Sequence, residues 1–291
     1  MVIKPRASPH EQTFIILHER NSNAEDIVSD LLVRPFDRYR NANNNRRFAA
    51  QSTETLRTAF PQAKFVFPRA PMLRASMLTG SSINQWFDIH WQSTEAREDS
   101  SRNSLNNELQ IPGLRDAVAY LHDLINEEIR VLNGRAGSVF IGGFGQGCAA
   151  SLISMLLWEG DTLGGWFGLS GWLPFAEEIA NAAQQGDEDG DEPGTPIEKS
   201  IAYLRKKLGI SASPQPDSRE GQSLLNTPLF IAHGADDRNV PIALGRQMVS
   251  SLESLGWGHH DVQWEEYRGL AHKFSENELI NLVDFLEERL A

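Results

Sequence analysis

Short apolar segments alternate with amphipathic helical patterns along this chain. This alternation predicts an α/β fold with a mostly parallel, doubly wound sheet and helices on both faces. The expected strands are 13–17, 63–68, 138–142, 166–170, 228–233 and 262–267. Apolar residues recur at helical spacing most clearly at 114–132 and 277–290. Without a repeat or a linker, we expect a single domain over 1–291, with a lid-like or loop insertion at 174–226.

The composition bounds the class of protein. The chain has 291 residues, 40% of them hydrophobic and 23% charged, which suits one large globular core. A net charge of −12 argues against nucleic-acid partners and against binding to anionic membranes. No apolar run reaches the about 18 residues of a membrane span, and the N-terminus lacks the apolar core of a signal peptide. We therefore expect a cytoplasmic protein without membrane insertion.

The segment 139–150 is the most informative part of the sequence. It reads as an apolar strand, a turn containing Gly143, Gly145 and Gly147, and the start of a small-residue helix. This is the setting of the nucleophile elbow G-x-S-x-G of α/β-hydrolases, although a phosphate-binding loop can have the same outline. Gly145 stands where the nucleophilic serine belongs, and glycine has no side chain that can attack a carbonyl.

An acid and a base follow the elbow in the order that α/β-hydrolases use. Asp236 and Asp237 come just after the expected strand 228–233, and His272 comes just after 262–267. Because the carboxyl ends of parallel strands meet at one edge of a sheet, these side chains are expected close to the elbow. Either position alone is weak evidence, but together with the elbow they predict a hydrolase-like site.

Five segments carry a closer resemblance. They match the family patterns G-F-S-Q-G at 143–147 with glycine for serine, H-G-x-x-D-x-x-V-P at 233–241, G-x-x-H at 269–272, S-G-W-L-P at 170–174 and W-[YF]-D-I at 86–89. On these motifs the chain resembles the acyl-protein thioesterase and carboxylesterase branch of the α/β-hydrolases, the phospholipase/carboxylesterase family, in a fungal-type form. The resemblance extends from 13 to 290 and is weakest over 174–226.

The resemblance implies the residue roles. It makes Asp237, rather than Asp236, the acid and His272 the base, and it makes the backbone amides of Arg20 and Gln146 the oxyanion donors. It implies a small-molecule or acylated-protein substrate, with no cofactor and no metal. The oligomeric state stays open.

The loop 18–24 departs from the family pattern H-G-x-G-S/D-x-G, because Glu19, Asn21 and Ala24 replace its glycines. A carboxylate that pointed into the site would oppose a developing oxyanion, and we expect Glu19 to face solvent. Ser22 and Glu25 are expected to form a capping box at the start of the next helix.

Apolar residues near these motifs are candidates for an acyl-binding pocket. They are Met72, Leu73, Trp172 and Leu173, with Met77 and Leu78 beside them. Ordinary core or loop cover explains any one of them equally well. The arginines at 34, 38, 40, 46 and 47 and the acidic run 186–192 are expected in solvated loops. Cys148 is expected to pack as a small hydrophobic residue and not to replace the missing nucleophile.

Three classes of function remain open from the sequence. The first is a serine-type ester or thioester hydrolase that is strongly impaired because Gly145 replaces the nucleophile. The second is a natural pseudoenzyme that binds an acyl or other small apolar ligand, and the third is an isomerase or lyase that uses His272 as base. The intact acid and base favour an engineered or recent loss of the serine, although the altered loop 18–24 favours natural drift. Restoring serine at 145 is predicted to raise ester hydrolysis at least about a hundredfold.

Overall fold

The structure is a computed structural model that describes residues 1–38, 54–76, 78, 80–90, 100–184, 194–211 and 220–290, with backbone alone for 100–106 and 220–222. Over this part of the chain, one sheet has seven strands in the order β1-β3-β2-β6-β7-β8-β9. Their bounds are β1 (Val2–Ile3), β2 (Gln12–Leu17), β3 (Ala63–Val66), β6 (Val139–Phe144), β7 (Gly165–Leu169), β8 (Leu229–Gly234) and β9 (Val262–Tyr267). All neighbours pair in parallel except β1, which is antiparallel to β3. The predicted fold class is confirmed, since this is the α/β-hydrolase arrangement.

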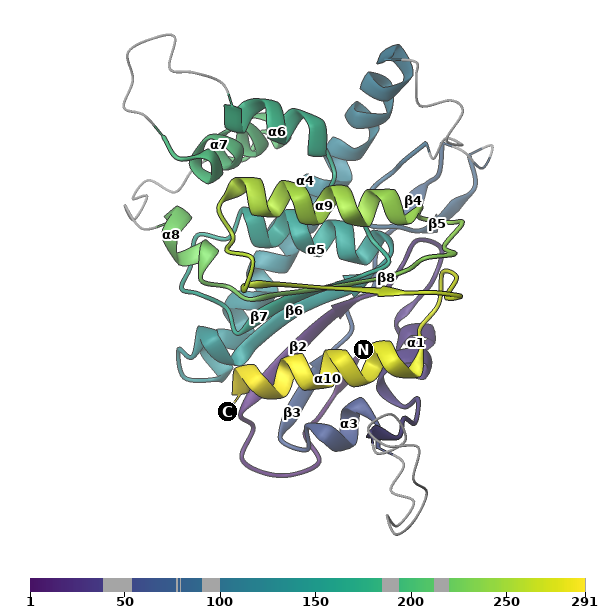
Figure 1. The fold of residues 1–291 in the computed structure, drawn as a ribbon, viewed down its shortest axis with the longest axis vertical. Helices are drawn as coiled ribbons and strands as arrows, with labels where there is room; N and C mark the ends of the chain where they lie inside the picture. The colour runs from purple at the N-terminus through teal and green to yellow at the C-terminus, as the bar shows by residue number, and fades with distance from the viewer. Residues whose placement is uncertain are drawn as a thin grey trace.

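Helices cover both faces of the sheet (Figure 1). One face carries α4 (Ser100–Val131), α5 (Gln146–Leu156) and α9 (Ile242–Leu255), and the other carries α10 (Glu276–Leu290), α3 (Leu56–Ala59) and α1 (Ala24–Ile27). A π-helical turn, Val28–Leu32, continues α1, and a 3-10 turn, Ala136–Ser138, precedes β6. A separate hairpin pairs β4 (Met72–Arg74) with β5 (Ser82–Asn84).

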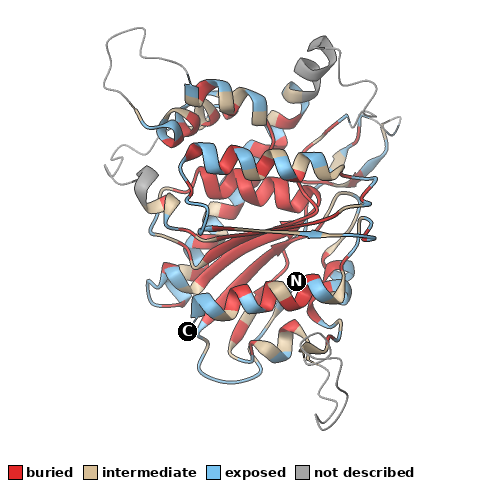
Figure 2. Ribbon diagram, viewed as in Figure 1, coloured by how far each residue is buried: buried red, intermediate tan, exposed pale blue. Residues whose placement is uncertain are grey.

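The central strands are buried on both faces, which explains why their sequences read as continuous apolar runs. Along β2, Phe14 and Ile16 belong to the core under α10, whereas Ile15 and Leu17 belong to the core under α5. Figure 2 shows the central strands β2, β6, β7 and β8 and helix α5 buried throughout, while α9 and α10 bury one side and expose the other. Buried strands of this kind hold their carboxyl ends, and the loops that follow, in fixed positions.

Some element boundaries differ from the sequence predictions. The helix expected at 114–132 already begins at Ser100, where the apolar stripe is too weak to show it, and contains Pro112. The predicted capping box at Ser22 is wrong, because Asn23 is the N-cap of α1. Its side-chain oxygen accepts hydrogen bonds from the amides of Glu25 (2.9 Å) and Asp26 (3.0 Å).

The region 174–226 contains α6 (Ala176–Gln184), α7 (Pro196–Leu208) and α8 (Glu220–Leu225). Figure 1 places α6 and α7 on the outer side of α9. Ile179 and Leu204 join the same hydrophobic core as α5, so these helices pack onto the main body. The acidic run 186–192 and the arginines at 40, 46 and 47 lie outside the described residues. None of the helices in the described part of the chain is both long and apolar enough to span a bilayer.

Candidate active site

The turn between β6 and α5 has the geometry of a nucleophile elbow. Gly145 is the residue between strand and helix, with φ 57° and ψ −118°, and its amide donates to the Leu169 carbonyl at 3.0 Å. Residues with a Cβ rarely adopt such a positive φ, whereas glycine adopts it without strain. The prediction that Gly145 occupies a sharp strand-to-helix turn is therefore confirmed.

The two flanking glycines are required by close backbone contacts. A Cβ added at Gly147 would lie 2.3 Å from the Leu17 carbonyl oxygen, and one at Gly143 would lie 2.5 Å from the carbonyl carbon of Gly147. Any side chain at either position would push α5 away from β2 and β6. The elbow is thus fixed by backbone packing, and this packing does not depend on the residue at its centre.

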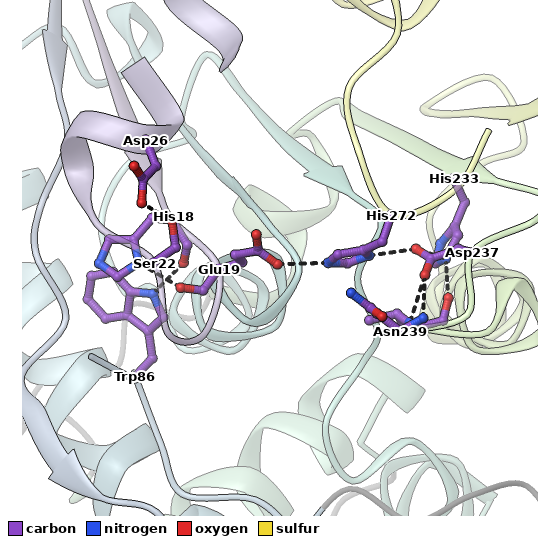
Figure 3. A network of polar contacts seen from close by, with 10 residues as sticks. His18, Glu19, Ser22, Asp26, Trp86, His233, Asp237, Asn239 and His272 are labelled. Atoms are coloured by element: carbon purple, nitrogen blue, oxygen red, sulfur yellow. Dashed lines mark hydrogen bonds and ion pairs between the residues drawn. The ribbon is translucent and has the colours of Figure 1, made fainter. Parts of the chain in front are cut away.

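The predicted hydrogen bond between His272 and Asp237 is present. The ring nitrogen Nδ1 of His272, in the loop after β9, donates to Oδ2 of Asp237, in the loop after β8, at 2.7 Å (Figure 3). The Asp237 side chain is fully buried, whereas the neighbouring Asp236 is exposed. The family motif therefore selected the aspartate that meets His272.

Asp237 is held as a carboxylate by several donors. Its Oδ1 accepts hydrogen bonds from the amides of Asn239 and Val240, both at 2.8 Å, and His233 lies 3.5 Å from Oδ2. Burial raises the pKa of Asp237, but the hydrogen bonds from His233, His272 and the Val240 amide outweigh burial and hold the pKa well below its usual range. A fixed negative charge thus orients His272 and stabilises its protonated form.

The expectation that Glu19 faces solvent is wrong for its Oε2, although the side chain is 37% exposed. Its Oε2 lies 2.9 Å from Nε2 of His272 (Figure 3). In a serine hydrolase this nitrogen is hydrogen-bonded to the serine hydroxyl. A Cβ added at Gly145 would lie 3.0 Å from the Glu19 Cβ and 3.3 Å from His272 Nε2. The Glu19 side chain therefore takes up the side of the elbow where a serine side chain would project.

The two carboxylates make His272 a cation. Ionised carboxylates can only accept hydrogen bonds, so an imidazole between Asp237 and Glu19 satisfies both by carrying a proton on each nitrogen. Burial lowers the pKa of His272, but the hydrogen bonds to Asp237 and Glu19 more than offset this and raise it to about 9. Near neutral pH this histidine is therefore a proton donor in the resting structure and not a free base.

The loop after β2 keeps its position without the family's glycines. The buried ring of His18 accepts a hydrogen bond from the Ala70 amide at Nε2 (3.0 Å) and donates from Nδ1 to the Glu19 carbonyl (2.7 Å). The Trp86 indole donates to the His18 carbonyl at 2.8 Å. Asn21 has φ 59°, a left-handed conformation that asparagine tolerates better than most residues. The loop therefore presents Glu19 from a well-anchored backbone.

The two residues expected to supply oxyanion donors are Arg20, which follows Glu19 in the sequence, and Gln146, which follows Gly145. Gln146 is the first residue of α5, where a backbone amide has no partner within the helix. Its buried side chain accepts from the Trp86 amide at 2.9 Å and donates to the Phe87 carbonyl at 2.7 Å, which fixes the segment 86–89 against the elbow. Arg20 donates from Nε to Gln85 at 2.8 Å. The role of the two backbone amides as oxyanion donors stays a prediction.

The candidate pocket residues fall into two groups. Trp172 and Leu173 are buried and follow Gly171, whose added Cβ would lie 3.2 Å from the Gly145 carbonyl oxygen. Met72 and Leu73 lie on the β4–β5 hairpin, where Met72 is 62% exposed. Leu78 is also exposed, and Met77 lies outside the described residues. The first group directly follows a residue that contacts the elbow, and a pocket role for either group stays a prediction.

Two further possibilities for chemistry can be assessed. Cys148 is fully buried, and burial raises the pKa of its thiol, so it packs as the small hydrophobic residue that the sequence predicted. Within the described ranges, no group of three or more His, Cys, Asp or Glu residues is arranged to hold a metal ion. The ionisable side chains that contact one another beside the elbow are His272, Asp237 and Glu19. The sequence predicted that Glu19 departs from the family loop, but not that it contacts His272. The signal that could have indicated this contact is that a carboxylate replaces a loop glycine in the same chain in which glycine replaces the serine.

Known proteins similar to this chain include hydrolases of one family. The model of the phospholipase/carboxylesterase family matches residues 48–188, a range that contains the elbow and ends before Asp237 and His272. An acyl-protein thioesterase 1 from Kluyveromyces lactis is 29% identical over 80% of this chain and 80% of its own length. One from Gibberella zeae is 26% identical over 99% of this chain and 95% of its own length.

A solved structure has the same fold. The crystal structure of Zea mays acyl-protein thioesterase 2 matches with a TM-score of 0.64 at 20% identity, covering 100% of this chain and 98% of that one. At this identity the likeness shows the α/β-hydrolase fold alone. In sequence, the chain is similar to the phospholipase/carboxylesterase family over residues 48–188 and to acyl-protein thioesterases over most of its length.

Proposed function

We propose that this protein is a modified member of the ester and thioester hydrolases, in which the Asp237–His272 pair operates without a serine nucleophile. The observation that carries the proposal is the 2.7 Å hydrogen bond between these two side chains beside an elbow whose central residue is Gly145. The relatives named acyl-protein thioesterases suggest acylated proteins or small acyl compounds as substrates. A cytoplasmic location remains a prediction from the sequence.

Serine-dependent catalysis is expected to be strongly impaired in this chain. In a serine hydrolase the histidine removes the serine proton, and loss of the serine costs several orders of magnitude in rate. Here Gly145 supplies no hydroxyl, and Nε2 of His272 is hydrogen-bonded to Glu19. Any hydrolysis by the native protein must therefore use a different nucleophile.

We further propose that Gly145 is natural, which reverses the preference drawn from the sequence. The Glu19 side chain fills the space beside Gly145, and an added Cβ there would approach the Glu19 Cβ to 3.0 Å. An engineered change at 145 alone would leave a loop glycine at 19 in place. The paired replacement supports adaptation of two positions to each other.

The same contact changes the variant that best tests the proposal. Serine at 145 alone would crowd the Glu19 Cβ and compete with its carboxylate for His272. Replacing Glu19 by glycine removes both obstacles, so Glu19→Gly/Gly145→Ser is the variant to make. We expect it to hydrolyse p-nitrophenyl esters or a palmitoyl thioester at least about a hundredfold faster than the native protein, a barrier difference of roughly 2.7 kcal/mol. Adding His272→Ala should remove the gain.

A folded double variant without activity on any of these acyl substrates would contradict the proposal. A second function would then be favoured, a pseudoenzyme that binds an acyl or other apolar ligand without hydrolysis. The ion pair between His272 and Glu19 is the observation that supports it, because it ties up the base in the resting state. It also counts against an isomerase or lyase in which neutral His272 removes a proton.

A further inference from the structure

We propose that Glu19 itself is the nucleophile of this site and that it attacks thioesters to form a mixed anhydride. This inference rests on the proposed function, because it assumes that acyl compounds reach the elbow. It moves the nucleophile from the α5 side of the elbow to the end of the neighbouring strand β2. The reacting centre would then consist of Glu19, His272 and Asp237.

The first support is the position of Glu19. β2 and β6 are neighbours with Leu17 opposite Gly143, so the loop after β2 runs directly beside the elbow. The Glu19 Cβ lies 3.0 Å from the position of a Cβ at Gly145, and Oε2 lies 2.9 Å from His272 Nε2. A carboxylate oxygen therefore lies within hydrogen-bonding distance of the nitrogen that faces the serine in a conventional site.

The second support is the gradient of burial along the three side chains. The Asp237 side chain is 0% exposed, that of His272 is 8% exposed and that of Glu19 is 37% exposed. Among the described residues, hydrogen bonding to the Glu19 carboxylate involves Oε2 alone. The Glu19 carboxylate is thus the most exposed of the three side chains, which follow one another in Figure 3, and we expect an incoming acyl group to meet it first.

The first chemical step follows from these contacts. An oxygen of Glu19 forms a bond to the acyl carbon of the thioester, and in this proposal the backbone amides of Arg20 and Gln146 stabilise the resulting oxyanion. The tetrahedral adduct collapses by breaking its carbon–sulfur bond. Protonated His272 gives its Nε2 proton to the leaving thiolate. The products are a free thiol, neutral His272 and an acyl anhydride on Glu19.

The second step returns the starting state. Water attacks the anhydride, and neutral His272 takes one proton from that water. The anhydride carbon–oxygen bond breaks to give the carboxylate of Glu19 and the carboxylate product. The second proton of the water passes to solvent, and Asp237 stabilises His272 as the cation that began the cycle.

The chemistry selects thioesters over alkyl esters. A carboxylate is a weaker nucleophile than an activated serine, so it needs a good leaving group. A thiol with a pKa of about 8.5 leaves far more readily than an alkoxide and matches a protonated histidine as acid. We therefore expect hydrolysis of an acyl-coenzyme A thioester but not of the ethyl ester with the same acyl chain.

The test is to incubate the native protein in excess with palmitoyl-coenzyme A and to quench the reaction in acid at short times. We expect mass spectrometry of the quenched protein to show a palmitoyl adduct that maps to the peptide containing Glu19. Treatment with borohydride before digestion should convert the acylated side chain to an alcohol at the same residue. Glu19→Gln should lower kcat/KM for the thioester at least about a hundredfold.

Glu25→Gln is the matched control, since Glu25 is an exposed carboxylate close by that pairs with Arg69 at 3.2 Å. It should retain native turnover, and urea unfolding should show that Glu19→Gln is folded. Turnover of the thioester by the native protein with Glu19 unmodified would overturn this inference, whether or not Glu19→Gln is active. No turnover by the native protein, with activity in Glu19→Gly/Gly145→Ser, would overturn it and leave the proposed function standing. Inactivity of both proteins would reject both.

Discussion

Two buried carboxylates lie near opposite ends of the same sheet, and each is paired with a basic side chain. At the amino ends of β2 and β3, Glu128 accepts hydrogen bonds from Lys64 at 2.6 and 2.8 Å and from Thr13 at 3.1 Å. At the carboxyl ends of β8 and β9, Asp237 pairs with His272, which continues to Glu19. The first group is complete within the fold, whereas the second ends in a partly exposed carboxylate.

The nearby histidines show what this difference means. His10 contacts Thr13 beside the Glu128 group at 3.0 Å, and burial lowers its pKa, which favours the neutral ring. His272 lies between two carboxylates, which raise its pKa to about 9. Lysine gives Glu128 a partner for an ion pair, while histidine gives Asp237 a partner that can exchange a proton near neutral pH. A buried carboxylate with a basic partner therefore stabilises the fold at Glu128, whereas in our proposal the buried carboxylate of Asp237 takes part in the reaction.

The largest expected effect separates Asp237 from its neighbour. In the Glu19→Gly/Gly145→Ser background, Asp237→Asn should lower ester hydrolysis by about a thousandfold or more, because His272 loses the charge that orients it. Asp236→Asn should change the rate little, since Asp236 is exposed. Initial rates on p-nitrophenyl esters provide the measurement. Equal losses in the two variants would remove the functional distinction between the adjacent aspartates.

The next effect concerns the opposite end of the sheet. Lys64→Met should lower the free energy of unfolding by about 3 kcal/mol, because it leaves the buried Glu128 carboxylate without its cation. Lys4→Met, at an exposed position, should change it by less than about 0.5 kcal/mol. Urea unfolding measures both. Activity per folded molecule should stay the same in Lys64→Met, and a selective loss of activity would contradict a purely structural role.

Backbone packing at the elbow should give a somewhat smaller effect. A Cβ at Gly147 would approach the Leu17 carbonyl oxygen to 2.3 Å, so Gly147→Ala should destabilise the protein by about 2 kcal/mol. Gly137 has open space around the added Cβ and serves as the control, for which Gly137→Ala should be close to neutral. Thermal unfolding compares the two. A neutral Gly147→Ala would show that α5 can move away from β2 without cost.

The smallest effect is on stability as a function of pH. Since the pKa of His272 is raised from 6.5 to about 9 on folding, its contribution is fully present below pH 6.5 and is lost as pH rises to about 9. We expect a loss on the order of 1–2 kcal/mol over this window, because the partly exposed Glu19 is screened by solvent. Glu19→Gln should flatten the slope. Urea unfolding at several pH values measures it, and an identical slope in that variant would show that Glu19 does not hold the proton.

Local patterns in the sequence were sufficient to predict the central strands and the elbow on which the site is built. Continuous apolar runs predicted the central strands because parallel strands are buried on both faces, and turn glycines marked the elbow. The motif around 233–241 separated Asp237 from Asp236, although they are adjacent. β1 escaped notice because it has only two residues, and the start of α4 escaped because it lacks an apolar stripe.

Contacts between distant residues could not be predicted in this way. Glu19 and His272 are 253 positions apart, and nothing local to Glu19 distinguishes a side chain that faces solvent from one that meets a cation. The hydrogen bond between Gln146 and the segment 86–89 also joins residues that are far apart in the sequence. The same holds for the hydrogen bond between the buried His18 and Ala70. The sequence by itself determined the central strands and the elbow, because these follow from short-range spacing, and the motifs it shares with a known family singled out Asp237 and His272. The tertiary structure alone decided that Glu19 points toward His272, because that direction depends on how the loops after β2 and β9 meet above the sheet.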